Sequence, residues 1–390
     1  MTRMIPYGRQ DISQEDIDAV VDVLKSDFLT QGPKVPAFES ALTSHTGAKY
    51  ALAVNSATSA LHIACMALEL GEGDWLWTSP NTFVASANAG LYCGAKVDFI
   101  DIDSRTYNLC PNKLEKKLQI ADLDGCLPKV LVPVHLCGQP CDMKRIRGLC
   151  NKYNVKIVED ASHAIGGSYQ GAPIGNCKYS DITVFSFHPV KIVTTAEGGA
   201  ALTNDHELAA KMALYRSHGI TRNHDEMTEI SHGAWYYQQI TLGYNYRMTE
   251  LQAALGSSQM TRLTEFVTTR HKIAERYNFL LKDLPVQIPY QLENTYSGLH
   301  LYVIRLKLDE ISVTHNEVFG ELRANQINVN LHYIPVHIQP YYKAMGFRYG
   351  DFPASEQYYK EAISLPMYPG LSQSDQDKVV RVLTSSLANK

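Results

Sequence analysis

The sequence predicts an α/β protein with a mostly parallel sheet in a large domain and a smaller α+β domain after it. Three observations predict this fold. The chain has 390 residues, enough for two domains. Short apolar runs alternate with helical stretches up to about residue 220, as βαβ units require. Beyond that point the alternation weakens, and the last hundred residues mix strand-like and helix-like segments.

The first 220 residues carry the pattern of the large domain. Residues 14–26 have the spacing of an amphipathic helix, with Ser13 as its N-cap. A Gly-Pro loop follows, and then a second helix over 36–45. Buried strands are expected at 50–54, 97–101, 130–134, 155–160, 182–187 and 199–203. Helices between them are expected at 59–70, 143–153 and 206–216.

The later residues predict one long loop and then the small domain. Residues 222–242 are polar and aromatic; they predict an extended loop that either helps to cover a site or is an ordinary surface insertion. A long helix with one break is expected from about 249 to 281. The small domain is expected to contain strands at 299–306 and 328–334 and helices at 315–326 and 373–388. The predicted division is 14–260 for the large domain and 261–390, with 1–13, for the small one.

Composition excludes several classes of partner. The chain has 36 Lys and Arg against 40 Asp and Glu, a net charge of -4, and it has no basic tract, so neither nucleic acid nor an anionic membrane is expected. The N-terminus has no apolar signal segment, and no apolar run is long enough for a transmembrane helix. The eight cysteines form no Cys-x-x-Cys pair. They predict free thiols in a reducing cytoplasm and no metal site.

Two charged residues lie at the ends of predicted strands. Asp160 directly follows one apolar strand, and Lys191 follows another 31 residues later. Ligands of open α/β sheets bind at the carboxyl ends of the strands. Alone, Asp160 could be a helix cap and Lys191 a solvated surface lysine. Together they match the needs of pyridoxal 5'-phosphate (PLP), which requires an amine to hold its aldehyde and an acid to keep its ring nitrogen protonated.

A third segment provides a candidate phosphate site. A strand ends at Asn55, and a helix then opens with small residues that include Ala57 and Thr58. The free N–H groups and the dipole of a helix N-terminus bind phosphate, although a plain N-cap explains the same pattern. Phe83 follows another strand-turn sequence and could stack on an aromatic ring or belong to the core.

Eight collinear segments resemble one protein family. They are LTQGP, NSATSAL, TFVASANA, EDASHAIGG, SFHPVKIVTTAEGGA, YRSHG, LGYNYRMTELQAALG and VNLHYIPVHIQPYY. In this order they resemble the nucleotide-sugar aminotransferases of the DegT/DnrJ/EryC1/StrS family, over nearly the whole chain. The resemblance implies the fold of type I PLP-dependent transferases, the aspartate aminotransferase-like fold.

The resemblance also implies roles for the residues around the cofactor ring. Lys191 would form the Schiff base with PLP and act as the catalytic residue. Asp160 would pair with the pyridinium nitrogen, and His163 would lie near the phenolic oxygen. Phe83 would stack on the ring.

Further roles concern the phosphate and a second subunit. By the same resemblance Ala57, Thr58 and Ser186 would hold the phosphate. Asn245 would reach the phosphate from the neighbouring subunit, which implies a homodimer with shared active sites. The candidates for the sugar-nucleotide pocket are Thr30, Gln31, Gly32, His188, Arg247, His332 and Tyr333.

The C-terminal segment HYIPVHIQPYYKAMGFRYGDFPASEQYYKEAISLPMYPGLS narrows the implied reaction. It resembles the branch of the family that serves pseudaminic acid biosynthesis and aminates C4 of UDP-2-acetamido-2,6-dideoxy-β-L-arabino-hexos-4-ulose, with L-glutamate as donor and 2-oxoglutarate as product. Two alternatives stay open at this stage. One is a related aminotransferase that takes another nucleotide or a different 4-keto or 3-keto sugar. The other is a PLP-binding protein without turnover.

Overall fold

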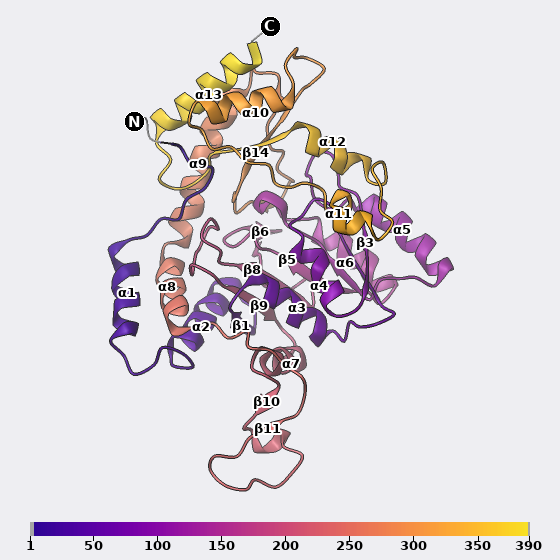
Figure 1. The fold of residues 1–390 in the computed structure, drawn as a ribbon, viewed down its shortest axis with the longest axis vertical. Helices are drawn as coiled ribbons and strands as arrows, with labels where there is room; N and C mark the ends of the chain where they lie inside the picture. The colour runs from indigo at the N-terminus through magenta and orange to yellow at the C-terminus, as the bar shows by residue number, and fades with distance from the viewer. Residues whose placement is uncertain (1–3, 389–390) are drawn as a thin grey trace.

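A seven-stranded sheet forms the centre of the computed structural model, which describes residues 4–388 (Figure 1). Its strands are β1 (Tyr50–Val54), β2 (Trp75–Thr78), β3 (Lys96–Phe99), β4 (Val130–Val132), β5 (Lys156–Asp160), β8 (Ile182–Ser186) and β9 (Gly199–Thr203). Their order is β1-β9-β8-β5-β4-β2-β3. Only β9 runs antiparallel to its neighbours within this sheet, which confirms the predicted mostly parallel α/β architecture.

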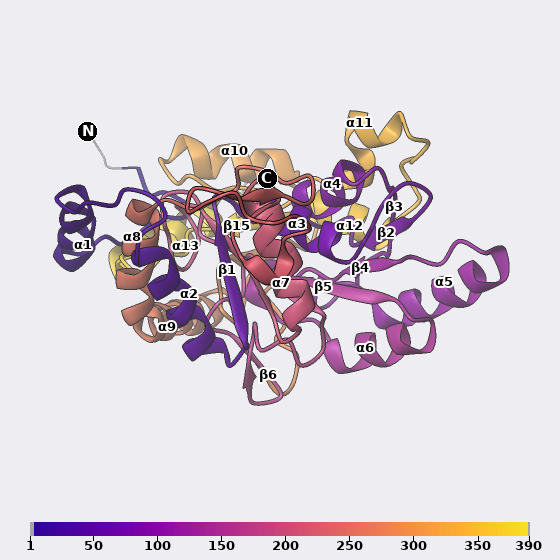
Figure 2. The same ribbon diagram turned by 90° about the horizontal axis from the view of Figure 1, so that it is seen from below.

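Helices cover both faces of this sheet (Figure 2). They are α2 (Lys34–Thr46), α3 (Ala57–Ala67), α4 (Ala85–Tyr92), α5 (Pro111–Asp124), α6 (Met143–Lys152), α7 (His206–Arg216), α8 (Glu250–Thr261) and α9 (Leu263–Leu281). Two apolar clusters fill the two interfaces. Val184 of β8 belongs to one and Phe185 to the other, because successive side chains of a strand face opposite ways. Burial on both faces explains why the strands read as continuous apolar runs.

A third apolar cluster lies at the other end of α9, where both chain ends are found (Figure 1). It is built from α9, α10 (His315–Ala324), α13 (Gln373–Ala388) and the antiparallel sheet β12-β14-β15, which consists of Val286–Gln287, Tyr302–Leu306 and Ala362–Leu365. Ile5 belongs to this cluster and donates its N–H to Gln326 O at 2.9 Å. The N-terminal segment thus packs with the C-terminal residues. The exact domain boundaries stay a prediction.

Most predicted elements are confirmed, and one is wrong. Helix α1 (Gln14–Leu24) begins at a Ser13 capping box, and the long helix breaks at Arg262. The strand predicted over 328–334 is not present: this segment makes one isolated bridge, from Asn330 to Ser364, and then leaves the sheet edge toward the cavity described below. Helix α4 was not predicted because its buried small residues have no amphipathic period.

Residues 220–242 form an arm that extends away from the rest of the molecule (Figure 1). The arm is closed at its base by the short pair β10 (Ile220–Thr221) and β11 (Gln238–Gln239). Its exposed apolar side chains include Ile230, which is 89% exposed, and Trp235, which is 75% exposed. The expected extended loop is therefore confirmed. The arm does not line the cavity of its own chain within the described residues.

All eight cysteines are free thiols, and five of them are buried. Among residues 4–388, no helix is long and apolar enough to cross a membrane.

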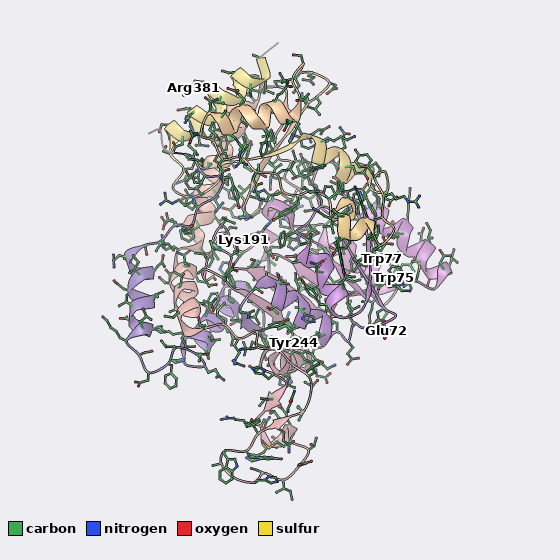
Figure 3. All side chains as sticks on the ribbon, in the orientation of Figure 1. Glu72, Trp75, Trp77, Lys191, Tyr244 and Arg381 are labelled. Atoms are coloured by element: carbon green, nitrogen blue, oxygen red, sulfur yellow. The ribbon has the colours of Figure 1, made fainter. Side chains whose placement is uncertain are left out.

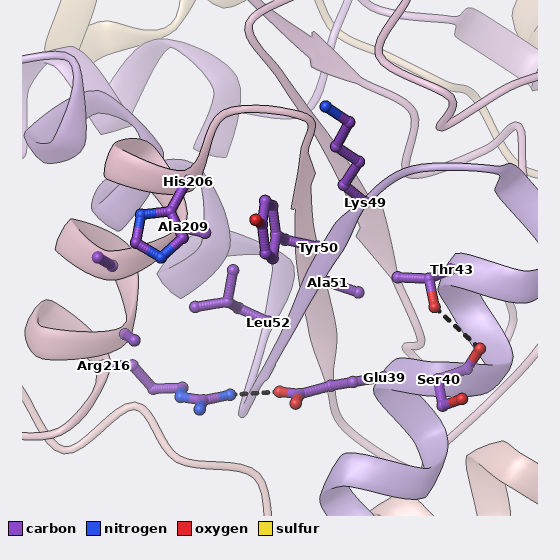
Figure 4. Close-up of a pocket in the computed structure, with 12 residues that line it drawn as sticks. Glu39, Ser40, Thr43, Lys49, Tyr50, Ala51, Leu52, His206, Ala209 and Arg216 are labelled. Atoms are coloured by element: carbon purple, nitrogen blue, oxygen red, sulfur yellow. Dashed lines mark hydrogen bonds and ion pairs between the residues drawn. The ribbon is translucent and has the colours of Figure 1, made fainter.

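An ion pair covers the open edge of the central sheet at β1 (Figure 4). Ala53 of this edge strand donates its N–H to Glu39 Oε1 at 2.8 Å, and its carbonyl accepts from Arg216 Nη1 at 2.9 Å. Glu39 and Arg216 also pair with each other, and each side chain is only 20% exposed. The pair therefore satisfies backbone groups that no neighbouring strand can satisfy.

We expect Glu39→Ala to lower the free energy of unfolding by about 1–3 kcal/mol, because it leaves the Arg216 guanidinium and the Ala53 N–H without their partner. Urea denaturation followed by circular dichroism measures the loss. Glu275→Ala, an exposed position on α9, is the matched control. Equal stability of the two variants would show that the edge needs no such cover.

Candidate active site

A cavity of about 620 Å³ opens at the carboxyl ends of the parallel strands. It reaches the starts of α3 and α4, and residues of the C-terminal part close it from the other side. Figure 3 shows Lys191 near the centre of the molecule. The cavity brings together ten of the predicted site residues: Ala57, Thr58, Phe83, Asp160, His163, Ser186, His188, Lys191, His332 and Tyr333. Strands β5 and β8 are neighbours in the sheet. For this reason Asp160 and Lys191, which are 31 positions apart in the sequence, meet in one cavity.

Five predicted site residues lie outside this cavity: Thr30, Gln31, Gly32, Asn245 and Arg247. The first three are in the loop between α1 and α2. Asn245 and Arg247 lie beside the end of β1. Arg247 forms an isolated antiparallel β-bridge with Val54, and the Asn245 carbonyl accepts a hydrogen bond from Asn55 Nδ2 at 3.4 Å. One chain alone thus does not bring these five residues to the cavity, and their roles stay predictions, of which only that of Asn245 was expected to involve a second subunit.

Lys191 sits in a turn after β8, where its N–H donates to His188 O at 2.9 Å. Burial lowers the pKa of its amine from 10.5 to about 8, although the negative charge of Asp160 partly opposes this shift. Desolvation penalises the charged form of a lysine, so about a tenth of this amine is neutral at pH 7, far more than for an ordinary lysine. A neutral amine is the form that attacks an aldehyde carbon.

The rate at which the apoenzyme bonds PLP covalently should therefore rise between about pH 7 and pH 9, with its midpoint near 8. Below the midpoint the amine is protonated and cannot attack; above it the nucleophile is fully available. Stopped-flow absorbance of PLP added to apoenzyme over a pH series measures this profile. A midpoint near the ordinary lysine value of 10.5 would contradict it.

Asp160 is buried at the end of β5, and both of its carboxylate oxygens accept hydrogen bonds. Ser86 Oγ donates to Oδ2 at 2.6 Å, and the Ser162 N–H donates to Oδ1 at 3.1 Å. These bonds fix the orientation of the carboxylate. Ser86 was not predicted as a site residue, although it lies in the segment TFVASANA, three residues after Phe83.

The ring of His163 has a defined tautomer. The Cys137 N–H donates to Nδ1 at 3.2 Å, so the hydrogen of the neutral ring is on Nε2, which lies 3.2 Å from Tyr333 Oη. Burial, together with the charge of Lys191, lowers the pKa of His163 and keeps the ring neutral. His163 therefore donates to Tyr333, and the Tyr333 hydroxyl hydrogen is free to point to another acceptor. Burial also raises the pKa of Tyr333, so that hydroxyl stays protonated.

Two further cavity residues were not found from the sequence. His300 is 3% exposed, packs 4.5 Å from the His163 ring and has a buried Nδ1 without a hydrogen-bond partner. Tyr7 packs 5.3 Å from the His332 ring. Both come from segments that showed no site pattern, and no local signal distinguished them from core residues.

Helix α3 begins at the cavity wall with unpaired backbone N–H groups. The Ser56 side chain accepts from the Ser59 N–H at 3.1 Å and caps the helix. The N–H groups of Ala57 and Thr58 have no carbonyl one turn earlier in the helix, so they can bind an anion. Ser186 at the end of β8 also lines the cavity. This geometry fits a phosphate group.

Gly199 allows the start of α3 to approach the sheet this closely. It pairs with Val54 on one side and Ser186 on the other. A Cβ atom at this position would lie 2.5 Å from the Ala57 nitrogen and 2.6 Å from the Ser56 carbonyl carbon. Both contacts are with backbone, so the helix start would have to move.

We expect Gly199→Ala to weaken PLP binding by about tenfold or more, because overpacking costs about 1–3 kcal/mol and the displaced atoms include the proposed phosphate donors. Titration of the apoenzyme with PLP gives the dissociation constant. Gly148→Ala on α6, where a Cβ meets open space, is the control. Equal PLP affinity of both variants would separate Gly199 from the phosphate site.

Comparison with known proteins gives the family of the chain. The sequence profile of the DegT/DnrJ/EryC1/StrS aminotransferase family matches residues 10–384. The chain belongs to this family. It is 38% identical over 387 residues to the UDP-4-amino-4,6-dideoxy-N-acetyl-beta-L-altrosamine transaminase of Campylobacter jejuni, covering 98% of each protein. It is also 38% identical over 382 residues to the spore coat polysaccharide biosynthesis protein SpsC of Bacillus subtilis, covering 97% of this chain and 96% of that protein.

Solved structures agree with this assignment. The chain superposes on PseC, the Helicobacter pylori aminotransferase of pseudoaminic acid biosynthesis, with a TM-score of 0.90, 31% identity and 99% coverage of both chains. It superposes on the PLP form of the putative sugar aminotransferase Spr1654 of Streptococcus pneumoniae with a TM-score of 0.88, 29% identity and 98% coverage of both. The protein is a PLP-dependent sugar aminotransferase with the type I fold expected from the sequence.

The residues of the cavity fit this cofactor. Three groups line this one cavity: the Lys191 amine with its lowered pKa, the buried and oriented Asp160 carboxylate, and the N-terminus of α3 with its unpaired N–H groups. Phe83, which is 57% exposed, lines the same space and lies 5.9 Å from the Tyr333 ring, so its face is available to a flat ligand. The ring, aldehyde and phosphate of PLP each have a chemically suitable partner.

Proposed function

We propose that the enzyme transfers an amino group from L-glutamate to C4 of UDP-2-acetamido-2,6-dideoxy-β-L-arabino-hexos-4-ulose. The observation that carries the chemistry is the pairing of Lys191, whose pKa is about 8, with Asp160 in one cavity at neighbouring strand ends. The similarity to the Campylobacter jejuni and Helicobacter pylori proteins along the whole chain supports the choice of sugar. The products are the 4-amino sugar nucleotide and 2-oxoglutarate.

The side chains of the cavity have different roles in this reaction. Bound PLP supplies an electron sink and carries the amino group from donor to acceptor. The Lys191 amine removes the proton from Cα of the donor and, in the second half of the reaction, delivers a proton to C4 of the sugar. Because Lys191 approaches from one side of the cavity, the new C–H bond at C4 forms on one face. Asp160 holds a proton on the ring nitrogen.

The Tyr333 hydroxyl is suited to contact the sugar or the cofactor oxygen. It accepts from His163 and keeps its own hydrogen available. His332, which neighbours it, has a pKa lowered to about 3 by burial and the nearby charge of Lys191, so it is a neutral ring. The substrate therefore meets neutral donors and acceptors on this wall.

The acceptor is tested with a panel of keto sugars. Purified enzyme is converted by glutamate to its aminated form, which removes the yellow colour, and UDP-, dTDP- and GDP-linked 4-keto and 3-keto sugars are then added one at a time. We expect the UDP-linked 4-keto sugar to restore the colour fastest. A preference for another nucleotide or for a 3-keto sugar would favour the alternative acceptor. This alternative is tested because the chain is as identical to SpsC, at 38%, as to the Campylobacter jejuni transaminase. No bleaching with glutamate would favour a PLP-binding protein without turnover.

We further propose that two copies share their active sites. Asn245 and Arg247 lie outside the cavity of their own chain, and the nearby arm exposes a set of apolar side chains that a second copy would cover: Ile230, Trp235, Tyr237 and Leu242. Exposed apolar groups of this size are typical of an interface. Asn245 would then donate to the phosphate bound in the other subunit.

Mixed dimers of Lys191→Ala and Asn245→Ala chains test this arrangement. If sites are shared, each mixed dimer has one site with both changes and one site with neither, so activity returns on mixing. If each chain completes its own site, every site carries one change and mixing restores nothing.

We also place the enzyme in the cytoplasm. The eight free thiols suit a reducing compartment, and sugar nucleotides with a glutamate donor are the proposed substrates. Fractionation of the source cells checks this location.

A further inference from the structure

The hydroxyl groups of Thr82 and Ser86 form a short hydrogen-bonded chain that ends at the Asp160 carboxylate. We infer that Ser86, supported by Thr82, is a positioning residue that keeps the Asp160 carboxylate aimed at the ring nitrogen of the bound cofactor, and thereby keeps that nitrogen protonated. This inference rests on the role proposed above for Asp160. Ser86 is fully buried, and Thr82, which is 2% exposed, lies between Ser86 and the cavity wall that it lines.

The number of hydrogens on each group gives the direction of the chain. Ser86 Oγ lies 2.6 Å from Asp160 Oδ2 and 2.8 Å from Thr82 Oγ1. A charged carboxylate has no hydrogen, so Ser86 must donate its single hydrogen to Asp160. Ser86 then has only lone pairs to offer Thr82, and Thr82 must be the donor of the second bond. The chain therefore runs from Thr82 through Ser86 to Asp160.

The direction has a chemical consequence. The bond from Ser86 orients the carboxylate, and a second bond upstream polarises the first donor and strengthens it. A carboxylate held against the ring nitrogen favours a proton there, which is the form of the ring that accepts electrons best. The other oxygen, Oδ1, accepts from the Ser162 N–H, so each oxygen has a protein donor and the carboxylate cannot rotate freely.

Ser86 and Asp160 lie far apart in the sequence and on different elements. The two residues are 74 positions apart, on α4 and β5, and come together only because β2 and β5 both flank β4 in the sheet. Ser86 does not line the cavity, so it has no role in contacting substrate or cofactor directly. Its effect must therefore pass through Asp160.

The test compares the holoenzymes of Ser86→Ala, Thr82→Val and Asp160→Asn, each loaded with PLP labelled with ¹⁵N at the ring. The ¹⁵N chemical shift reports the protonation of the ring nitrogen and does not depend on turnover; kcat and KM are measured in parallel. For Ser86→Ala we expect a shift toward the unprotonated ring and a fall of about tenfold in kcat with little change in KM, the size expected for one charge-assisted hydrogen bond. Thr82→Val should show a smaller change in the same direction.

Controls separate this role from a loss of packing. Ser386→Ala removes another buried hydroxyl, on α13 and far from the cavity, and should leave the ¹⁵N shift and kcat unchanged. Ser86→Thr keeps a hydroxyl and should restore the ¹⁵N shift of the wild type. If Asp160→Asn moves the shift and both Ser86→Ala and Thr82→Val do not, the inference is overturned and the proposed function stands. If Asp160→Asn itself leaves the shift unchanged, both fail.

Discussion

Lys191→Ala should lose at least about 1,000-fold in kcat while it still binds PLP. The change removes the amine proposed to bond the cofactor and to move protons at donor Cα and at sugar C4. The proposed phosphate site at the start of α3 and the carboxylate of Asp160 are untouched, so we expect the cofactor still to be held without a covalent bond. The absorbance of lysine-bound PLP should be missing from the spectrum.

Turnover assays and absorbance spectra of the purified variant measure both effects. Lys49→Ala, an exposed lysine at the start of the same sheet, is the control and should keep the wild-type spectrum and rate. Activity of Lys191→Ala within tenfold of the wild type would remove Lys191 from the mechanism.

Asp160→Asn should lower kcat by about 100-fold or more and weaken PLP binding, because a neutral amide cannot hold a proton on the ring nitrogen. The amide has nearly the same shape as the carboxylate, so the packing around β5 is preserved. One oxygen remains to accept from Ser86, and the NH2 group must face the Ser162 N–H or the cavity. The loss is therefore one of charge.

The measurement is single-turnover kinetics with glutamate, which isolates the proton-removal step, together with PLP titration of the apoenzyme. Asp142→Asn is a suitable control, because this aspartate caps α6 away from the cavity. If Asp160→Asn reacted with glutamate at the wild-type rate, the electron-sink role would belong to another group.

Most strands and helices of the large domain could be predicted because they follow from local pattern, whereas β2, α4 and α5 were not predicted. Strands buried on both faces read as apolar runs, and the three surface-capped helices at residues 14, 206 and 250 begin at Ser13, Asp205 and Thr249. The prediction for residues 328–334 was wrong because it, too, used local pattern alone. The pattern suits a strand, but pairing also depends on where the edge of the neighbouring sheet lies. In the folded chain the segment pairs only at Asn330.

The Asp160 and Lys191 pair could be predicted from local pattern alone, because each residue follows an apolar strand and the carboxyl ends of parallel strands meet at one edge. The family could be predicted as well, through motifs that lie in order along the chain. The groups that contact this pair from behind depend instead on tertiary packing. Ser86 lies in a recognised segment, but only strand order brings it to Asp160. His300 and Tyr7 reach the cavity from segments without a local signal, because packing between distant residues brings them there.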